Sequence, residues 1–267
     1  MKKINLNDGT TIYCIKETEA IVLDEHIKGY MDFDFELKNN DIIIDVGANI
    51  GVFGIRLSQV LKNVEIHAFE PIPQIYEVLK KNSEISLNSN FNTYRMGLSH
   101  KKEQLDFTYY PNSPALSTAQ PEIWENDEDN FVSAVAGSIS NVPKNIWWAK
   151  LIPPFFAPLI ARYLKSNQKK VKSKVITLSD FIEETQIKKI NLLKIDCEGH
   201  EVNVLKGIKD NHWPLIKIII MEVNDVNNNF EISKTILSKH GFTNIQIEKE
   251  KGFEKTTLIN IYATRKI

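Results

Sequence analysis

The chain has 267 residues, which is enough for one substantial α/β domain with an insertion but short for two full-sized domains. Its 33 basic and 34 acidic side chains leave a net charge of −1, so no overall field draws the protein to nucleic acid or to anionic lipid. Cys14 and Cys197 are the only cysteines, and no charged-then-apolar leader is recognisable, which indicates a reducing, cytoplasmic compartment without disulfides.

Apolar runs and helical periodicity predict strands and helices that alternate along most of the chain. Before residue 100 we expect a β-like entry at 9–15, a helix at 19–31, a strand at 41–46, a helix from about Val52, a strand at 64–70, a helix at 75–85 and a strand at 91–99. After residue 170 we expect a helix at 177–185 capped by Ser179, a strand at 190–196, a helix at 200–208, a strand at 216–223 and a helix at 230–241. The chain closes with an antiparallel hairpin of 242–249 with 257–264.

The nearly continuous aliphatic strands indicate the fold class. Such strands are buried on both faces, which is typical of an α/β fold with a mostly parallel sheet and helices on each side. The strand–helix rhythm stops in one stretch that is rich in Pro, Ser, Asn and Trp. We therefore divide the chain into an N-terminal extension at 1–40, a main domain at 41–110 and 171–267, and an insertion at 111–170.

Acidic residues stand at the ends of four predicted strands: Asp45, Glu70, Asp196 and Glu222. Each one alone is also consistent with a helix N-cap. Because parallel sheets bind ligands at the carboxyl ends of their strands, the four together predict a binding site.

The turn DVGANIG follows the first of these strands. It lacks both the GxGxxG pattern of dinucleotide folds and the lysine of a P-loop, and the Asp45 carboxylate would disfavour a nearby phosphate by about 1 to 4 kcal/mol. S-adenosylmethionine suits such a turn, because it carries an ammonium and a sulfonium and no phosphate. Gly47 and Gly51 would let the backbone approach this cofactor, and Asn49 tolerates a tight turn. Glu70 is expected to accept the ribose hydroxyls, although helix–strand packing alone is another explanation for the glycines.

The motifs DVGANIG, AFEPIP, TLSDF, LLKIDCEGHEVNVLKGI and IIIMEV resemble, in order and spacing, the FkbM-type S-adenosylmethionine-dependent methyltransferases, over roughly residues 41–240 outside most of the insertion. The resemblance implies a Rossmann-like class I methyltransferase fold with a seven-stranded sheet and an antiparallel C-terminal hairpin. It also implies mostly O-methylation of polyketides, peptides or sugars. The predicted cofactor contacts are Asp45, Gly47, Asn49, Gly51, Glu70, Pro71, Asp196 and Glu198, the last two near the methionine end or the acceptor.

A hydroxyl acceptor must lose its proton, and two routes stay open. In the first, His200, or less favourably His26 or His100, acts as general base. In the second, Asp196, Glu222 and Asn224 or Asp225 hold Mg²⁺, which lowers the pKa of the acceptor. Asp196, His200 and Glu222 are therefore the predicted catalytic residues.

The insertion has three interpretations. It is a lid that lines a pocket for a bulky, partly apolar acceptor, a helical subdomain that packs on the sheet or on a second subunit, or a membrane-surface attachment, which lacks a clean amphipathic period. Its most apolar window, 146–164, is interrupted by two basic residues and three prolines, so no spanning helix is expected.

The sequence thus predicts an S-adenosylmethionine-dependent O-methyltransferase of secondary metabolism or of sugars, acting on a hydroxylated small molecule. The alternatives are an N-methyltransferase, whose Asn/Asp-Pro-Pro-aromatic motif is absent from the strand ends, and a non-catalytic cofactor-binding scaffold. Nucleic acid and membrane contact are not expected, and a homo-oligomer is left open.

Overall fold

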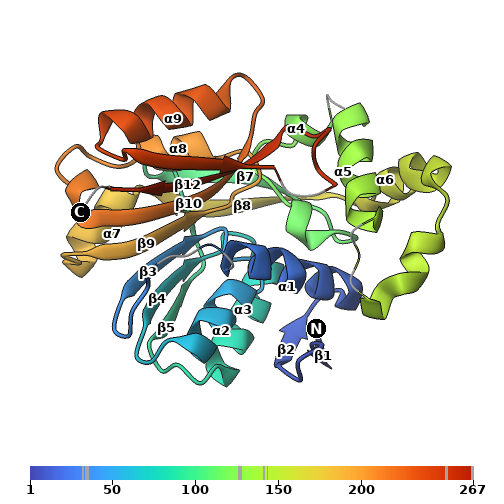
Figure 1. The fold of residues 1–267 in the computed structure, drawn as a ribbon, viewed down its shortest axis with the longest axis horizontal. Helices are drawn as coiled ribbons and strands as arrows, with labels where there is room; N and C mark the ends of the chain where they lie inside the picture. Colours follow the sequence, from blue (N-terminus) through green and yellow to red (C-terminus); the bar gives the residue numbers. More distant parts are fainter. Residues whose placement is uncertain are drawn as a thin grey trace.

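A seven-stranded sheet forms the centre of the computed structural model, which describes residues 1–31, 33, 36–125, 128–140, 142, 144–249 and 252–265. In spatial order its strands are β11 (Asn244–Glu248), β12 (Leu258–Thr264), β10 (Ile216–Asn224), β9 (Ile190–Ile195), β3 (Ile42–Val46), β4 (Glu65–Phe69) and β5 (Phe91–Tyr94) (Figure 1). Neighbours from β10 to β5 are parallel, whereas β12 is antiparallel to both β10 and β11. The predicted Rossmann-like class I methyltransferase fold, with its mostly parallel sheet and antiparallel C-terminal hairpin, is confirmed.

Alternate residues of each strand enter two separate cores. Ile43 and Leu192 belong to the core on one face of the sheet, and their neighbours Ile44 and Leu193 belong to the core on the other. The first core also takes residues from α1 (Glu17–Met31), α2 (Val52–Val60) and α3 (Pro73–Ile85), and the second from α7 (Leu178–Thr185), α8 (Glu201–Lys206) and α9 (Asn229–Lys239). Burial on both faces explains why the strands are almost wholly aliphatic.

The order of the strands reverses between β3 and β9. From β3 the chain continues outward through β4 to β5, and it later returns to place β9 on the other side of β3. In doubly wound sheets this reversal opens a crevice at the carboxyl ends of the two strands, where ligands bind. The residues that follow β3 and β9 are therefore held next to each other.

A second sheet of three strands was not predicted. It consists of β6 (Gly97–Leu98), β8 (Lys169–Ile176) and β7 (Glu103–Tyr109), in that order. The single strand expected at 91–99 is thus wrong, because β5 pairs with the main sheet and β6 with β8. The N-terminal strands β1 (Lys2–Asn5) and β2 (Thr11–Cys14) form a separate pair, and the short helix η4 (Trp213–Leu215) precedes β10.

The insertion lies between β7 and β8. It contains η1 (Pro114–Leu116), α4 (Glu122–Glu125), α5 (Glu128–Ser140), η2 (Lys144–Leu151), η3 (Pro154–Phe156) and α6 (Ala157–Lys165), which gather on the right of Figure 1. Tyr110, Trp124 and Phe131 form part of a small core of its own. Nowhere among the described residues is there a helix long and apolar enough to cross a membrane.

The cap of α7 differs from the prediction. The hydroxyl of Thr177, not of Ser179, accepts a hydrogen bond from the backbone N–H of Asp180 at 2.9 Å, and the Asp180 carboxylate accepts one from the N–H of Thr177 at 3.2 Å. Ser179 lies inside the helix, where its hydroxyl accepts a hydrogen bond from the N–H of Lys209 at 2.7 Å. A reciprocal pair satisfies two helix-end donors, so it begins the helix two residues earlier than Ser179 would.

Candidate functional site

A cavity of about 1230 Å³ lies at the carboxyl ends of β3, β4, β9 and β10, between α1 and the insertion. It exceeds the roughly 300 to 1,000 Å³ of a pocket for one small molecule, so it has room for two ligands side by side. The predicted site residues that line it are Gly47, Asn49, Glu70, Pro71, Asp196, Glu198, His200 and Glu222. Three other predicted site residues that the structure describes, Asp45, Gly51 and Asn224, lie outside this lining.

Gly47 is required by a close approach of two backbone segments. Its φ is 77°, and a Cβ at this position would stand 1.8 Å from the carbonyl oxygen of Asp196. The N–H groups of Gly47 and Ala48 both donate to the carbonyl of Phe69, at 3.0 and 2.9 Å. The turn after β3 is therefore fixed against the ends of both β4 and β9.

Gly51 has a different reason to be glycine. Its φ is 83°, and a Cβ there would stand 2.6 Å from Cδ1 of Leu79 on α3. Helix packing, the alternative explanation that the sequence left open, therefore accounts for this residue.

Glu70 presents a buried carboxylate to the cavity. Its Oε1 accepts a hydrogen bond from the N–H of Ile72 at 2.9 Å, and its Oε2 accepts one from the N–H of Asn49 at 3.2 Å. Burial raises the pKa of Glu70 to about 8, although these two backbone hydrogen bonds act in the opposite direction. A carboxylate has about four acceptor positions, so Glu70 retains two for donors on a ligand.

Asp45 lies behind the cavity wall rather than at its mouth. It is 0% exposed, and its Oδ1 is 3.2 Å from Nζ of Lys194, its register partner on β9. The same Nζ is 3.4 Å from Oδ2 of Asp196. Burial raises the pKa of Asp45 and the Lys194 ammonium opposes this change. Because Lys194 already compensates the charge of Asp45, this charge does not make the turn prefer a cationic ligand, contrary to the expectation from the sequence.

Lys194 is the site residue that sequence reasoning missed. A signal was present, since a lysine stands in the mostly aliphatic segment INLLKI of a doubly buried strand. Burial alone would lower the pKa of Lys194, but Asp45 and Asp196 reverse this effect and raise it. The charged form is thus held in place between two carboxylates.

His200 has both ring nitrogens engaged. Nε2 is 2.9 Å from the hydroxyl of Ser99, and Nδ1 is 3.2 Å from the side-chain amide of Asn203 and 3.4 Å from that of Gln120. Both amide groups donate, so Nδ1 accepts and Nε2 carries the proton. Burial lowers the pKa of His200 to about 4. This arrangement leaves no lone pair for a substrate hydroxyl, which weighs against the role of general base.

His26 is better placed among the three histidines that the sequence offered. It lines the cavity from α1, and its Nε2 is 2.8 Å from the hydroxyl of Tyr30 and 3.7 Å from Oε2 of Glu222. His100, by contrast, is exposed at the surface. The structure thus brings the predicted residue Glu222 together with His26 rather than with His200.

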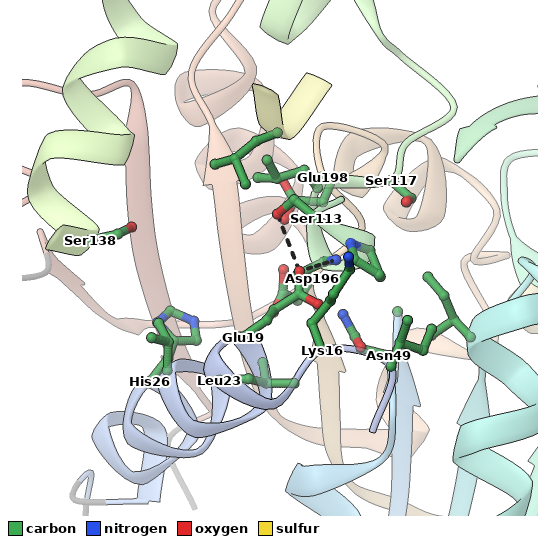
Figure 2. Close-up of a pocket in the computed structure, with 18 of the residues that line it drawn as sticks. Lys16, Glu19, Leu23, His26, Asn49, Ser113, Ser117, Ser138, Asp196 and Glu198 are labelled. Atoms are coloured by element: carbon green, nitrogen blue, oxygen red, sulfur yellow. Dashed lines mark hydrogen bonds between the residues drawn. The ribbon is translucent and has the colours of Figure 1, made fainter. Parts of the chain in front are cut away.

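The centre of the cavity is acidic. Glu19, which the sequence did not single out, accepts hydrogen bonds through Oε1 from the N–H of Ala115 at 2.8 Å and from the hydroxyl of Ser113 at 3.2 Å (Figure 2). Burial raises the pKa of Glu19 to about 7. Burial, followed by the charges of Asp196 and Glu222, raises the pKa of Glu198 well above its ordinary value. In the view of Figure 2, Asp196 and Glu198 lie between Asn49 on one side and His26 and Ser138 on the other.

The predicted magnesium ligands are not assembled. Oδ1 of Asn224 accepts a hydrogen bond from the hydroxyl of Thr257 at 2.6 Å, and Oδ1 of Asp225 accepts one from the N–H of Phe230 at 3.0 Å. Asp196 already has the Lys194 ammonium as its counter-ion. Within the part of the chain that the structure describes, no three His, Cys, Asp or Glu side chains are grouped as a metal site. The positions of the proposed ligand side chains therefore do not support the magnesium hypothesis.

Comparison with known proteins identifies relatives along almost the whole chain. The family described as "Methyltransferase FkbM domain" matches residues 45–253. The chain is 28% identical over 268 residues to the 31-O-demethyl-FK506 methyltransferase FkbM of Streptomyces tacrolimicus, covering 99% of this chain and 97% of that protein. It is 29% identical over 246 residues to Methyltransferase 1 of Beauveria bassiana, covering 91% and 89%. A solved S-adenosylmethionine-dependent O-methyltransferase of Thermotoga maritima aligns with a TM-score of 0.48 at 11% identity, covering 100% and 78%.

Proposed function

The chain belongs to the FkbM family of S-adenosylmethionine-dependent methyltransferases, and we propose that it methylates a hydroxyl group of a bulky, partly apolar natural product. The observation that carries this proposal is the one continuous cavity, which joins the glycine turn and Glu70 to an acidic centre and then to a largely apolar chamber under the insertion. Similarity to a relative named as a 31-O-demethyl-FK506 methyltransferase supports oxygen as the acceptor atom.

The residues at one end of the cavity suit S-adenosylmethionine. Gly47 lets the backbone come close, Asn49 and Pro71 complete the wall, and Glu70 keeps two acceptor positions for the ribose hydroxyls. When bound, the cofactor supplies an electrophilic methyl group on a sulfonium.

The other end of the cavity suits an apolar acceptor. Its walls include Leu23 of α1, Val135 and Ile139 of α5, Ile160 of α6 and Leu258 of β12. Pockets of this kind bind the body of a ligand through apolar contact and orient it through a few polar groups. We therefore place the acceptor between α1 and the insertion, with its hydroxyl directed to the acidic centre.

His26 is the general base of this proposal. It stands on the acceptor side of Asp196, and Glu222, 3.7 Å away, would stabilise the imidazolium that forms when His26 takes the hydroxyl proton. We favour His26 over His200 because Glu222 lies 3.7 Å from His26, whereas burial lowers the pKa of His200 to about 4 and makes it a weak base. Asp196 and Glu198 would position the two reacting groups, and the insertion would act as a lid that excludes water.

The test is a mass-spectrometric screen of labelled methyl transfer to hydroxylated polyketides, peptides and saccharides, each with a matched amine analogue. We expect an O-methylated product from an apolar hydroxylated compound. His26→Gln should lower turnover at neutral pH by about 100-fold and leave cofactor binding unchanged, whereas His100→Gln, a change at an exposed histidine, should change neither turnover nor cofactor binding. Methylation of amines alone would refute O-methylation, and cofactor binding without turnover across the panel would favour a scaffold. Normal turnover by a folded, cofactor-binding Asp196→Ala variant would refute the role of Asp196.

A further inference from the structure

Seven large apolar side chains within residues 147–163 of the insertion are exposed. They form what we call the aromatic patch: Trp147, Trp148, Leu151, Phe155, Phe156, Leu159 and Tyr163. Their exposed fractions run from 39% to 72%. Single exposed apolar residues are normal on a soluble protein, whereas a contiguous group marks a surface that contacts something else.

Helix α6 carries large apolar residues on its outward side in addition to Ile160 and Leu164, which pack on the small core of the insertion. It buries Ala157 and Ala161, which are 3% and 1% exposed, and turns Leu159 and Tyr163 outward at 63% and 59%. A helix that packs only against its own protein directs its large apolar residues inward. Arg162, on the same helix, is also exposed. The outward face of α6 therefore combines apolar and cationic groups.

The segment that carries the aromatic patch has charges of one sign. Residues 141–170 contain six lysines and arginines and no aspartate or glutamate, although the whole chain carries a net charge of −1. Lys169 and Lys170, where the chain leaves the insertion, are exposed. Clustered basic residues beside exposed aromatic ones are typical of segments that lie in the interface of an anionic bilayer.

The aromatic patch also adjoins the cavity. Trp148 and Tyr163 line the cavity and are 52% and 59% exposed, so the cavity reaches the surface at the patch. In Figure 1, α6 and the segment before it project from the end of the molecule away from the sheet. A projecting surface can approach a bilayer without interference from the rest of the fold.

We propose that the aromatic patch docks this protein on an anionic membrane surface, with the mouth of the cavity facing the lipid. Charge complementarity favours the bilayer over a second copy of the chain, because two such patches would bring like charges together. Membrane-surface attachment was the least favoured of the three interpretations of the insertion, because the sequence does not reveal which apolar side chains face outward. It does not depend on the identity of the acceptor or on methyl transfer.

Vesicle sedimentation tests the proposal with the full chain and without cofactor or acceptor. The vesicles consist of phosphatidylcholine alone, or of phosphatidylcholine with about one third phosphatidylglycerol. We expect binding to the anionic vesicles that weakens between about 0.1 M and about 0.5 M salt. The double variant Leu151→Asp, Phe155→Asp should lose at least about tenfold in affinity. The matched control is Val60→Asp, Leu87→Asp, which changes two apolar residues that are 65% and 93% exposed elsewhere, and it should stay within about twofold of wild type.

Tryptophan emission gives a second readout. Trp124 and Trp213 are buried at 1% and 2% exposure, so a blue shift on adding anionic vesicles must arise at Trp147 and Trp148. The shift should vanish in Trp147→Phe, Trp148→Phe. The proposal is overturned if the wild type binds neither vesicle, if the patch and control variants bind equally well, or if light scattering shows a dimer that only the patch variant loses. Unchanged circular dichroism of both aspartate variants confirms that they fold.

Discussion

Lys194→Met tests whether a buried ion group holds the wall of the cavity together. Lys194 Nζ stands 3.2 Å from a carboxylate oxygen of Asp45 and 3.4 Å from one of Asp196, and the Lys194 and Asp45 side chains are 3% and 0% exposed. Methionine is flexible, unbranched and of similar length, so the substitution removes the charge with little change in volume.

The expected loss follows from the charges that remain. At an effective dielectric constant near 20, each of the two contacts corresponds to about 5 kcal/mol of Coulomb attraction, which the desolvation of the three ions largely offsets. Removing the lysine alone leaves Asp45 buried without a counter-ion, so we expect the free energy of unfolding to fall by about 3 to 5 kcal/mol. Asp45→Asn in the same chain removes the stranded charge, and the double variant should recover most of that loss.

Guanidinium unfolding of the wild type, both single variants and the double variant measures these differences in the free energy of unfolding. Lys209→Met is the matched control, because Lys209 pairs with Glu183 at 2.6 Å while the two side chains are 52% and 50% exposed. An exposed pair contributes at most about 1 kcal/mol. If Lys194→Met costs no more than Lys209→Met, or if the double variant is no more stable than Lys194→Met, the reasoning about this buried group is wrong.

Four further predictions concern other parts of the site. Gly47→Ala puts a methyl group 1.8 Å from the carbonyl oxygen of Asp196, so turnover should fall by about 100-fold, and steady-state rates near wild type would contradict this. Because the pKa of Glu70 is about 8, cofactor affinity measured by calorimetry should rise about tenfold from about pH 7 to about pH 9 as the carboxylate ionises, and Glu70→Gln should abolish that rise. Because the pKa of Glu70 is raised from 4.5 to about 8 in the folded free enzyme, its contribution to stability is fully present below pH 4.5 and is lost as the pH rises to about 8. The unfolding midpoint of the wild type should therefore fall across this pH range, and that of Glu70→Gln should fall less. Turnover should survive chelation by EDTA, because the side-chain oxygen of Asn224 is engaged by Thr257 and the Lys194 ammonium stands 3.4 Å from Asp196, where it repels a second cation; a loss that Mg²⁺ restores would refute this.

The fold was predictable because its strands carry a strong signal. A strand buried on both faces must be almost wholly aliphatic, and acidic residues directly after such strands stand out. Glu70, Asp196 and Glu222 were found in this way, and all three line the cavity. Periodicity also located α2, α3 and α9 to within a few residues.

The remaining features depend on contacts between distant segments. Strand β8 reads KKVKSKVI, in which Val171, Ser173 and Val175 alternate with exposed lysines, but its neighbours β7 and β6 are distant in the sequence and its start lies in the stretch assigned to the insertion. His200 is hydrogen-bonded to Ser99, Gln120 and Asn203, and the first two lie 101 and 80 residues away from it along the chain. Whether Asp45 faces a ligand or a lysine likewise depends on which strand becomes its neighbour. Sequence patterns describe single elements and do not specify such neighbours.

The antiparallel pairing of β7 and β8 has a consequence for how this enzyme can be altered. Tyr109 and Lys169 face each other across the pair, so the chain enters and leaves the insertion at one point. Paired residues on antiparallel strands have Cα atoms only about 5 Å apart, a gap that a two-residue turn can close. One continuous stretch of the gene, codons 110–168, therefore encodes much of the wall on the acceptor side, whereas Gly47, Glu70 and Asp196 lie outside it. A chimera that exchanges only this stretch between relatives would transfer acceptor preference without rebuilding the methyl donor site.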